Sequence, residues 1–294
     1  MLSSQGTSLR SAFLPMEAQS PTSFKIATAF PPMQMFPETL KVIARENLPN
    51  VAQILVQAQT LNEFRKLLQK ITPEHLSKIA ELTIGQSDTT DWFYYRQGVV
   101  TATLTKRICT NAKKGEGKNH KIDASISKLG DEKLFYPAIL YGRTMEPNAV
   151  KCFFETFKNT HEKAKLLNVG FKLHQELKII GGSADGVLQC DCDDCPKNRI
   201  LEVKCPYRLK GQSIQKNWKI LEYLTPNCEL KQNHEYHYQI QTYLGLYGYS
   251  EAILLIWSEI DYITIKVNFD SAMWNLICES TVNYYYKFYA QNYF

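Results

Sequence analysis

One stretch, Gly181 to Pro206 (GGSADGVLQCDCDDCPKNRILEVKCP), constrains the fold more than any other part of the 294-residue chain. Short apolar runs stand on either side of a polar segment, which predicts two antiparallel strands joined by a turn. Because side chains alternate along a strand, Glu202 and Lys204 should share one face, and Asp185 should open the preceding strand. Two carboxylates beside one ammonium are costly to bury unless a cation pairs with the acids.

The chemistry that needs this trio is metal-assisted hydrolysis of a phosphodiester. Hard divalent cations such as Mg²⁺ prefer carboxylate oxygens and water, and a bound cation polarises the phosphate and generates hydroxide. A neighbouring lysine can orient the water and offset the charge that builds on the phosphate. A Glu-x-Lys pair alone also occurs on surface strands as an exposed ion pair. An Asp, a variable loop and then Glu-x-Lys is the nuclease signature of the restriction-endonuclease-like fold.

Four motifs in the same order resemble the YqaJ viral recombinase family, which includes the lambda-type exonucleases. The hairpin motifs SADG and LEVKCP carry most of this resemblance. Residues 92–103 are similar to the family's W-x3-R-x-G-x-I-T-A-S stretch, residues 141–149 to its G-x3-E-x2-A stretch, and residues 236–243 to its Y-x2-Q-x-Q helix. The resemblance covers roughly residues 91–268.

The resemblance implies an α/β (α+β) fold with a restriction-endonuclease-like core, in which helices flank a central mixed β-sheet. It places the chain in the PD-(D/E)xK nuclease superfamily and implies a metal-dependent deoxyribonuclease that uses Mg²⁺, with Mn²⁺ as the alternative cation. The metal ligands implied by the match are Asp185, Glu202, the backbone carbonyl of Val203 and Glu146. Lys204 would position the attacking water, and Gln239 would border the metal site.

The position of Glu146 can also be argued from its neighbours. Glu146 stands directly before Pro147, and an apolar stripe follows. Proline is favoured at the first position of a helix, so the pattern predicts that a helix begins here. Glu146 would then lie near the helix N-terminus, where negative charge is stabilised. An ordinary glutamate at a helix start is the alternative to a metal ligand.

The same match assigns contacts with DNA. In the family, the arginine and hydroxyls of the first motif lie near the DNA end and its phosphate, which would give that role to Arg96, Thr101 and Thr103. The family usually has serine where this chain has Thr103, and the hydroxyl is retained. Pairing of Arg96 with a nearby acid such as Asp91 is the alternative. The remaining predicted contacts are Lys106 and Arg107, on the basic face of a helix over residues 101–112, and Tyr243.

The turn between the catalytic strands contains Cys190, Cys192 and Cys195. A C-x-C-x2-C group could hold Zn²⁺ with a fourth ligand, and Cys205 is the nearest candidate in sequence. However, Cys205 is expected behind the catalytic face, and the usual spacing of paired zinc knuckles is absent. Reduced turn cysteines are the favoured interpretation, and a zinc site is the alternative.

Composition sets broader limits. The formal charge of +5 and the pI near 8.6 suit a polyanionic partner. We expect no membrane association, because no apolar run reaches spanning length. Without a secretory leader, and with cysteines that do not form a disulfide scaffold, an intracellular protein of the nucleus or cytoplasm is expected. The expected units are a flexible tail (1–37), an N-terminal helical extension (38–85) that either packs or binds a partner, and a YqaJ-like nuclease domain (86–294).

Apolar periodicity predicts the remaining elements of the domain. A strand is expected over residues 171–180, a helix over 233–247, and a hairpin from strands at 252–257 and 262–267. Residues 270–294 should form an aromatic-rich helix. Its aromatic side chains either stack on bases or, as we favour, pack in a core or against another subunit.

Together these features predict a nuclease that acts on duplex DNA ends, as a lambda-type exonuclease in recombination or repair. An exonuclease is favoured over an endonuclease. The alternatives are a catalytically silent DNA-binding or recruitment protein and a zinc-bearing interaction domain. Lambda-type relatives form rings around duplex DNA, so the resemblance also suggests a homo-oligomer. It suggests a recombination partner protein as well.

Overall fold

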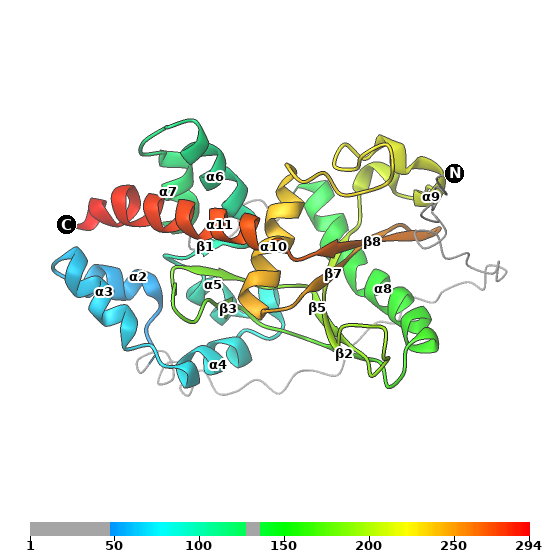
Figure 1. The fold of residues 1–294 in the computed structure, drawn as a ribbon, viewed down its shortest axis with the longest axis horizontal. Helices are drawn as coiled ribbons and strands as arrows, with labels where there is room; N and C mark the ends of the chain where they lie inside the picture. Colours follow the sequence, from blue (N-terminus) through cyan, green and yellow to red (C-terminus); the bar gives the residue numbers. More distant parts are fainter. Residues whose placement is uncertain (1–47, 128–135) are drawn as a thin grey trace, which may run out of the picture.

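The computed structural model describes residues 48–127 and 136–294. The expected tail, residues 1–37, lies outside the described residues. Figure 1 shows the arrangement of helices and strands along the longest axis of the molecule. None of the helices in the described ranges has the length and apolar content needed to span a membrane.

In the described part of the chain, the larger sheet has five strands in the order β2-β5-β6-β7-β8 (Figure 1). The strands are Lys165–Leu167 (β2), Gly186–Gln189 (β5), Asn198–Lys204 (β6), Glu251–Trp257 (β7) and Tyr262–Asn268 (β8). The β6–β7 pair is parallel and the other pairs are antiparallel. Both hairpins expected from the sequence are therefore confirmed, and the sheet is mixed.

Helices cover both faces of this sheet, which explains why its central strands are nearly continuous apolar runs. Leu201, Val203 and Leu255 pack against the apolar stripe of α8 (Pro137–Thr160). The alternate positions, including Ile200 and Leu254, pack against α10 (Glu235–Tyr247) on the opposite face. The predicted α/β class, with a central mixed sheet flanked by helices, is confirmed.

A second sheet of three short strands, within the described ranges, has the order β1-β4-β3. Its strands are Val100–Thr101 (β1), Lys172–Leu173 (β3) and Ile180–Gly182 (β4). The single strand predicted over 171–180 is wrong, because the chain turns back between β3 and β4. His174 makes this turn: its Nδ1 accepts the backbone N–H groups of Glu176 and Leu177 at 3.1 and 2.9 Å.

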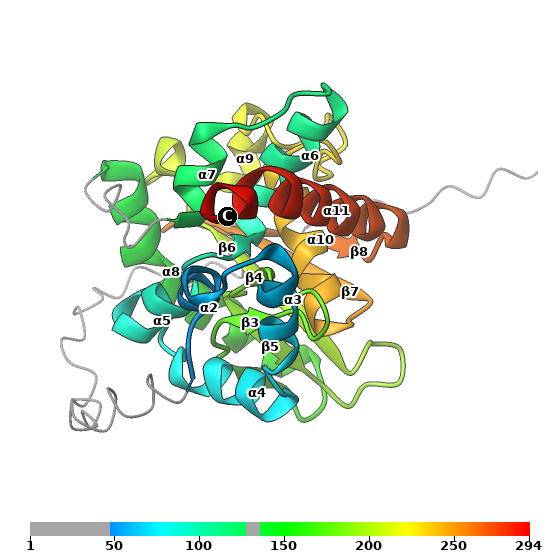
Figure 2. The ribbon, with the colours of Figure 1, turned by 90° about the vertical axis from the view of Figure 1, so that its left-hand side faces the viewer.

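The helices α2 (Val51–Gln57), α3 (Leu61–Gln69) and α4 (Pro73–Leu82) form the N-terminal extension. They begin at the polar caps Asn50, Thr60 and Thr72, whose side chains accept backbone N–H groups. Their apolar faces share one core with the end of the chain, where Phe64 stacks on Tyr285. Figure 2 shows α2 and α3 beside the C-terminal end of the molecule. The division at residue 85 stays a prediction.

The remaining helices pack around these layers. They are α5 (Thr90–Tyr95), α6 (Thr105–Lys113), α7 (His120–Ser127), α9 (Ile214–Asn217) and α11 (Ser271–Tyr284). The aromatic run that begins in α11 packs in the core, as favoured above: Tyr284, Tyr285 and Tyr289 are buried.

The helix predicted to begin at Pro147 begins ten residues earlier, so the expectation that Glu146 lies near a helix N-terminus is wrong. Pro147 sits inside α8, which starts at Pro137. A proline in a helix removes one hydrogen bond to the preceding turn, but it does not always end the helix. Pro147 is on the exposed side of α8, where water can replace the missing donor.

Candidate active site

The predicted catalytic residues lie where β6 extends past the end of β5. Gly186 is the first residue of β5 and pairs with Leu201, so β6 continues without this neighbour from Glu202 onward. Asp185 occupies the vacated position, and its Oδ2 accepts the Val203 N–H at 2.7 Å. The hairpin therefore holds two carboxylates at one end, as its alternation predicted.

Glu202 and Lys204 share one face of β6. Glu202 has only 1% of its side chain exposed, and its Oε1 pairs with Lys204 Nζ. The same ammonium lies 4.6 Å from the ring centre of Tyr236 on α10, a favourable cation–π distance. Contacts from two elements therefore hold the ammonium beside the acid.

Helix α8 brings a third carboxylate to the site. Burial, followed by the negative charges of Asp185 and Glu202, raises the pKa of Glu146 to about 8. The positive charges of Lys204 and Arg143 act in the opposite direction. Because these effects require proximity, Glu146 lies close to the hairpin acids, although it is distant from them in sequence.

The site contains more acidic than basic groups. Burial and the Asp185 carboxylate raise the pKa of Glu202 to about 8. Burial also raises the pKa of Asp185, opposed by Lys204 and by the Val203 N–H. Burial alone would lower the pKa of Lys204, but the two acids outweigh it and raise this pKa, which keeps the lysine charged. A cation bound among these acids would relieve their repulsion and desolvation.

Glu202 provides the test of whether these residues fit a metal ion. Its second oxygen, Oε2, is buried and has no hydrogen-bond partner among the described residues. Such an oxygen is energetically unfavourable unless something pairs with it. The surrounding donors are carboxylate oxygens, which Mg²⁺ and Mn²⁺ prefer. The donor set therefore fits such a cation.

The predicted ligand set stays a prediction. It comprises Glu146, Asp185, Glu202 and the backbone carbonyl of Val203. The carboxylate oxygens of the three acids do not all lie within 4.8 Å of one another. The hairpin thus supplies two of these acids, and α8 supplies the third.

Gln239 and Tyr243 approach the site from α10. Gln239 Nε2 donates to the Tyr243 hydroxyl at 2.8 Å. Burial, followed by the charges of Glu202 and Asp185, raises the pKa of Tyr243. Gly182 makes room for the ring, since a Cβ there would lie 2.7 Å from Tyr243 Cε1. Tyr243 is only 3% exposed, so little of it is accessible to DNA, and that contact stays a prediction.

Arg96 stands at the end of α5, with its guanidinium carbon 3.7 Å from the ring centre of Trp92. Its charge is among those that act on Tyr243, which places it near the acid cluster. Trp92 is itself fixed by a 2.8 Å hydrogen bond from Nε1 to Ser183 Oγ, two residues before Asp185. Arg96 is therefore positioned by the segment that also positions Asp185.

The two threonines of the predicted DNA contact lie together. Thr101 is in β1, Thr103 is in the 3₁₀ turn that follows, and their hydroxyl oxygens are 3.1 Å apart. The helix predicted over 101–112 begins at Thr105, because the strand and the turn come first.

Lys106 and Arg107 line an open hollow of ≈ 380 Å³ between α6 and α7, together with Lys121. Its lining also includes Glu116 and Glu235, and none of the three acids of the candidate site is part of it. Burial, with added repulsion from Lys106 and Lys204, lowers the pKa of His234 at the start of α10.

Sequence reasoning missed some residues that support the site. Gln86 Nε2 donates to the Ala184 carbonyl at 2.7 Å and so holds the residue before Asp185. Gln86 lies upstream of the recognised motifs, and nothing in its local sequence indicated this contact. Trp92 and Arg143, by contrast, lie inside two of the motifs, so their proximity to predicted site residues was a usable signal.

Comparison with known proteins places this geometry in a family. The model of the YqaJ-like viral recombinase domain matches residues 91–250, which is more than half of the chain. The chain belongs to the YqaJ-like family. The matched residues include every predicted catalytic side chain. A search of curated proteins finds no match to the YqaJ-like chain.

Two of the matched solved structures have TM-scores above 0.5 and share the fold. The shutoff and exonuclease protein from Kaposi's sarcoma-associated herpesvirus is 11% identical, with a TM-score of 0.53, and the match covers 86% of this YqaJ-like chain and 83% of that protein. A SOX–DNA complex is 10% identical, with a TM-score of 0.51 and coverage of 80% and 76%. An alkaline exonuclease from Laribacter hongkongensis is 20% identical, with a TM-score of 0.48 and coverage of 67% and 90%.

Proposed function

We propose that this protein is a metal-dependent deoxyribonuclease that hydrolyses phosphodiester bonds at the ends of duplex DNA. The observation that carries the proposal is the buried, unpaired Oε2 of Glu202. It lies in a group of acids whose pKa values are raised by burial and mutual repulsion. Such an arrangement opposes stability, and a cation that serves hydrolysis accounts for it.

Each residue has a distinct role in this proposal. Asp185, Glu202, Glu146 and the Val203 carbonyl hold Mg²⁺ or Mn²⁺. The bound cation would polarise the phosphate and lower the pKa of water. Lys204 orients the attacking water and offsets charge on the phosphate.

The residues around the acids would bind the substrate. Gln239 can hydrogen-bond a water or a phosphate oxygen, although it now bonds Tyr243. Arg96 and the hydroxyls of Thr101 and Thr103 bind the end phosphate, for which a guanidinium is well suited. Lys106 and Arg107 bind the backbone beyond it.

An exonuclease that acts in recombination or repair is the specific form of the proposal. Family membership supports it, and so does the shutoff and exonuclease protein, which shares the fold. The competing function is a DNA-binding or recruitment protein that keeps the nuclease fold without activity. Asp185, Glu202 and Lys204 disfavour it, because a binding protein has no use for two buried acids that share one lysine and leave a carboxylate oxygen unpaired among the described residues.

One experiment separates these functions. End-labelled linear duplex and covalently closed circular duplex are incubated with the purified protein, with Mg²⁺ or with EDTA. The proposal predicts release of label from the linear duplex, an intact circle, and no reaction with EDTA. Cleavage of the circle would indicate an endonuclease. A protein that shifts both DNAs in a gel but cleaves neither with Mg²⁺ or Mn²⁺ would be the silent binder.

A further inference from the structure

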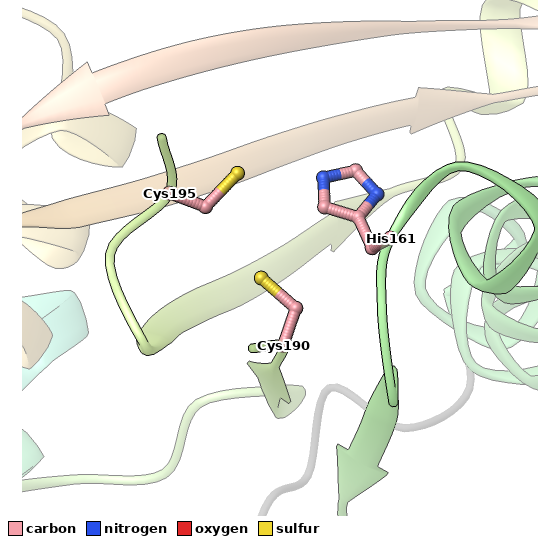
Figure 3. Close-up of side chains that lie close together, drawn as sticks. All are labelled: His161, Cys190 and Cys195. Atoms are coloured by element: carbon pink, nitrogen blue, oxygen red, sulfur yellow. The ribbon is translucent and has the colours of Figure 1, made fainter. Parts of the chain in front are cut away.

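A second group of metal-ligating side chains lies at the other end of the β5–β6 hairpin. The ligand atoms of His161, Cys190 and Cys195 all lie within 4.8 Å of one another. Figure 3 shows the two sulfur atoms and one ring nitrogen of His161 turned toward a common point. Cys190 follows β5, Cys195 precedes β6, and His161 directly follows α8. Three separate chain positions therefore converge on one small volume.

The histidine ring is oriented as a metal ligand. Its Nδ1 lies 3.1 Å from the Phe157 carbonyl oxygen, and the ring stacks on the Phe157 ring with centres 3.9 Å apart. The Thr160 hydroxyl oxygen also lies 3.0 Å from Nδ1. A carbonyl oxygen can only accept, so in the tautomer that donates from Nδ1 to Phe157 the Nε2 atom keeps its lone pair. Metal-bound histidines commonly donate their second nitrogen in this way. Burial also lowers the pKa of His161, which favours the neutral ring.

The cysteines are placed to bind as thiolates. Arg199 is buried, and its Nη2 donates to Cys190 Sγ at 3.3 Å. Burial opposes ionisation of Cys190, but hydrogen bonds from Cys192 and the charge of Arg199 outweigh it and lower the Cys190 pKa. Burial raises the pKa of Cys195, and a bound metal would supply the charge that deprotonates it.

A third sulfur lies next to this group. Cys192 Sγ accepts the backbone N–H of Glu162 at 3.3 Å, and the Cys192 thiol also acts on Cys190 through a hydrogen bond. Glu162 is the residue after His161, so the two segments that carry the ligands are also joined through their backbones. All eight cysteines lie in the described part of the chain and have free thiols.

We propose that His161, Cys190, Cys192 and Cys195 bind a structural Zn²⁺. Three sulfurs and one imidazole nitrogen form a closed tetrahedral set that zinc accepts and Mg²⁺ does not. Two thiolates on one tetrahedral zinc lie about 3.8 Å apart, given a Zn–S distance of about 2.3 Å. The ligand atoms of His161, Cys190 and Cys195, which all lie within 4.8 Å of one another, need only a small contraction to reach this geometry, and Cys192 would complete the set. The fourth ligand, which local sequence did not supply, is His161 and not Cys205.

The zinc would join the end of α8 to the turn of the catalytic hairpin. Helix α8 carries Glu146, and the hairpin carries Asp185 and Glu202 at its opposite end. The zinc site therefore fixes the two elements that bring the acids together without touching the acids. It is a structural role that does not depend on the proposed nuclease activity.

Metal analysis of the full chain tests the proposal. Protein purified without chelator should contain about one zinc per chain. The variants Cys190→Ser, Cys195→Ser and His161→Asn should lose most of it, whereas Cys152→Ser, a cysteine on α8 outside the cluster, should retain it. Wild-type protein that is folded and free of zinc, or that contains iron instead, would overturn the proposal.

A second measurement uses the wild-type chain, so it does not depend on whether the variants fold. Co²⁺ added to chelator-treated protein should give the absorption of tetrahedral cobalt with thiolate ligands. Zinc should displace the cobalt and should protect Cys190 and Cys195, but not Cys152, from alkylation mapped by mass spectrometry. Absence of thiolate–cobalt absorption, or a Cys190–Cys195 disulfide in the freshly purified protein, would reject the zinc site.

Discussion

The two ends of the β5–β6 hairpin carry opposite kinds of metal-ligating chemistry. At one end, Asp185 and Glu202 present oxygens, and Glu202 Oε2 is left without a partner among the described residues. At the other end, Cys190 and Cys195 present sulfurs within 4.8 Å of the His161 ring nitrogen. Asp185, Cys190 and Cys195 flank the strands β5 and β6, and Glu202 lies on β6, so one hairpin holds both groups at opposite ends.

The comparison shows how one hairpin can serve two purposes. The thiol end is compact and is supported by the backbone of Glu162 and the charge of Arg199, as expected of a closed structural site. At the acid end, burial and mutual repulsion raise the pKa values of Glu146 and Glu202, and one carboxylate oxygen lacks a partner among the described residues, as expected of a site that binds a cation. Hard oxygens and soft sulfurs would also keep the two proposed metals apart.

Replacing a hairpin acid should distinguish the functions of the two ends of the hairpin most clearly. Asp185→Asn or Glu202→Gln should reduce metal-dependent cleavage by about 10³-fold or more, because each removes a charged metal ligand. DNA binding and zinc content should persist. Single-turnover cleavage measures the loss, and a filter-binding assay with metal analysis provides the controls. Near-normal turnover by either variant would falsify the catalytic assignment.

Replacing a thiol ligand should have the reverse pattern. Cys190→Ser should lower the free energy of unfolding by about 3 kcal/mol, the contribution of a ligand present at a few hundred times its dissociation constant. The midpoint of thermal unfolding should then fall by about 6–12 °C for a domain of this size. A zinc-selective chelator should lower the wild-type midpoint similarly and leave that of Cys190→Ser unchanged.

The control for this stability prediction is Cys152→Ser, which should respond to the chelator as the wild type does. Circular dichroism follows the unfolding. If the chelator does not change the thermal unfolding midpoint of the wild type, the thiol end does not stabilise the protein through a bound metal.

Lys204 tests whether the acid end needs a lysine or merely a positive charge. Lys204→Ala and Lys204→Arg should both slow single-turnover cleavage by about 10²-fold or more, because the wide, planar guanidinium would misplace the water. The concentration of Mg²⁺ needed for half-maximal rate should change little, since lysine is not a ligand. Full activity of Lys204→Arg would mean that Lys204 contributes only its positive charge. Full activity of Lys204→Ala would exclude Lys204 from the mechanism.

Arg96 should give the smallest effect and extend the comparison to the substrate. Arg96→Ala should reduce activity on ends with a 5′ phosphate by about tenfold more than on hydroxyl ends, because a hydrogen bond between charged groups contributes about 1.5–3 kcal/mol. Parallel rates on the two labelled duplexes measure the difference. An equal loss on both would make Arg96 a structural residue or a general backbone contact.

The sequence by itself determined the hairpin and the direction of its side chains. Strand alternation placed Glu202 and Lys204 on one face, and the sheet register places Asp185 beside them. The second hairpin and the helix α10 were also predictable, because each depends on local periodicity, whereas the central mixed sheet was implied by the family resemblance. These elements were confirmed almost within their expected bounds.

Only the tertiary structure decided where distant segments meet. Glu146 looked like a residue at a helix start, but the packing of α8 across the sheet places it in mid-helix near the hairpin acids. His161 had no local signal, because it lies at the end of α8 and meets Cys190 through the same packing. Periodicity reports which face of an element is buried. Which elements pack against one another through these buried faces depends on contacts between residues far apart in the chain. Local patterns do not encode those contacts.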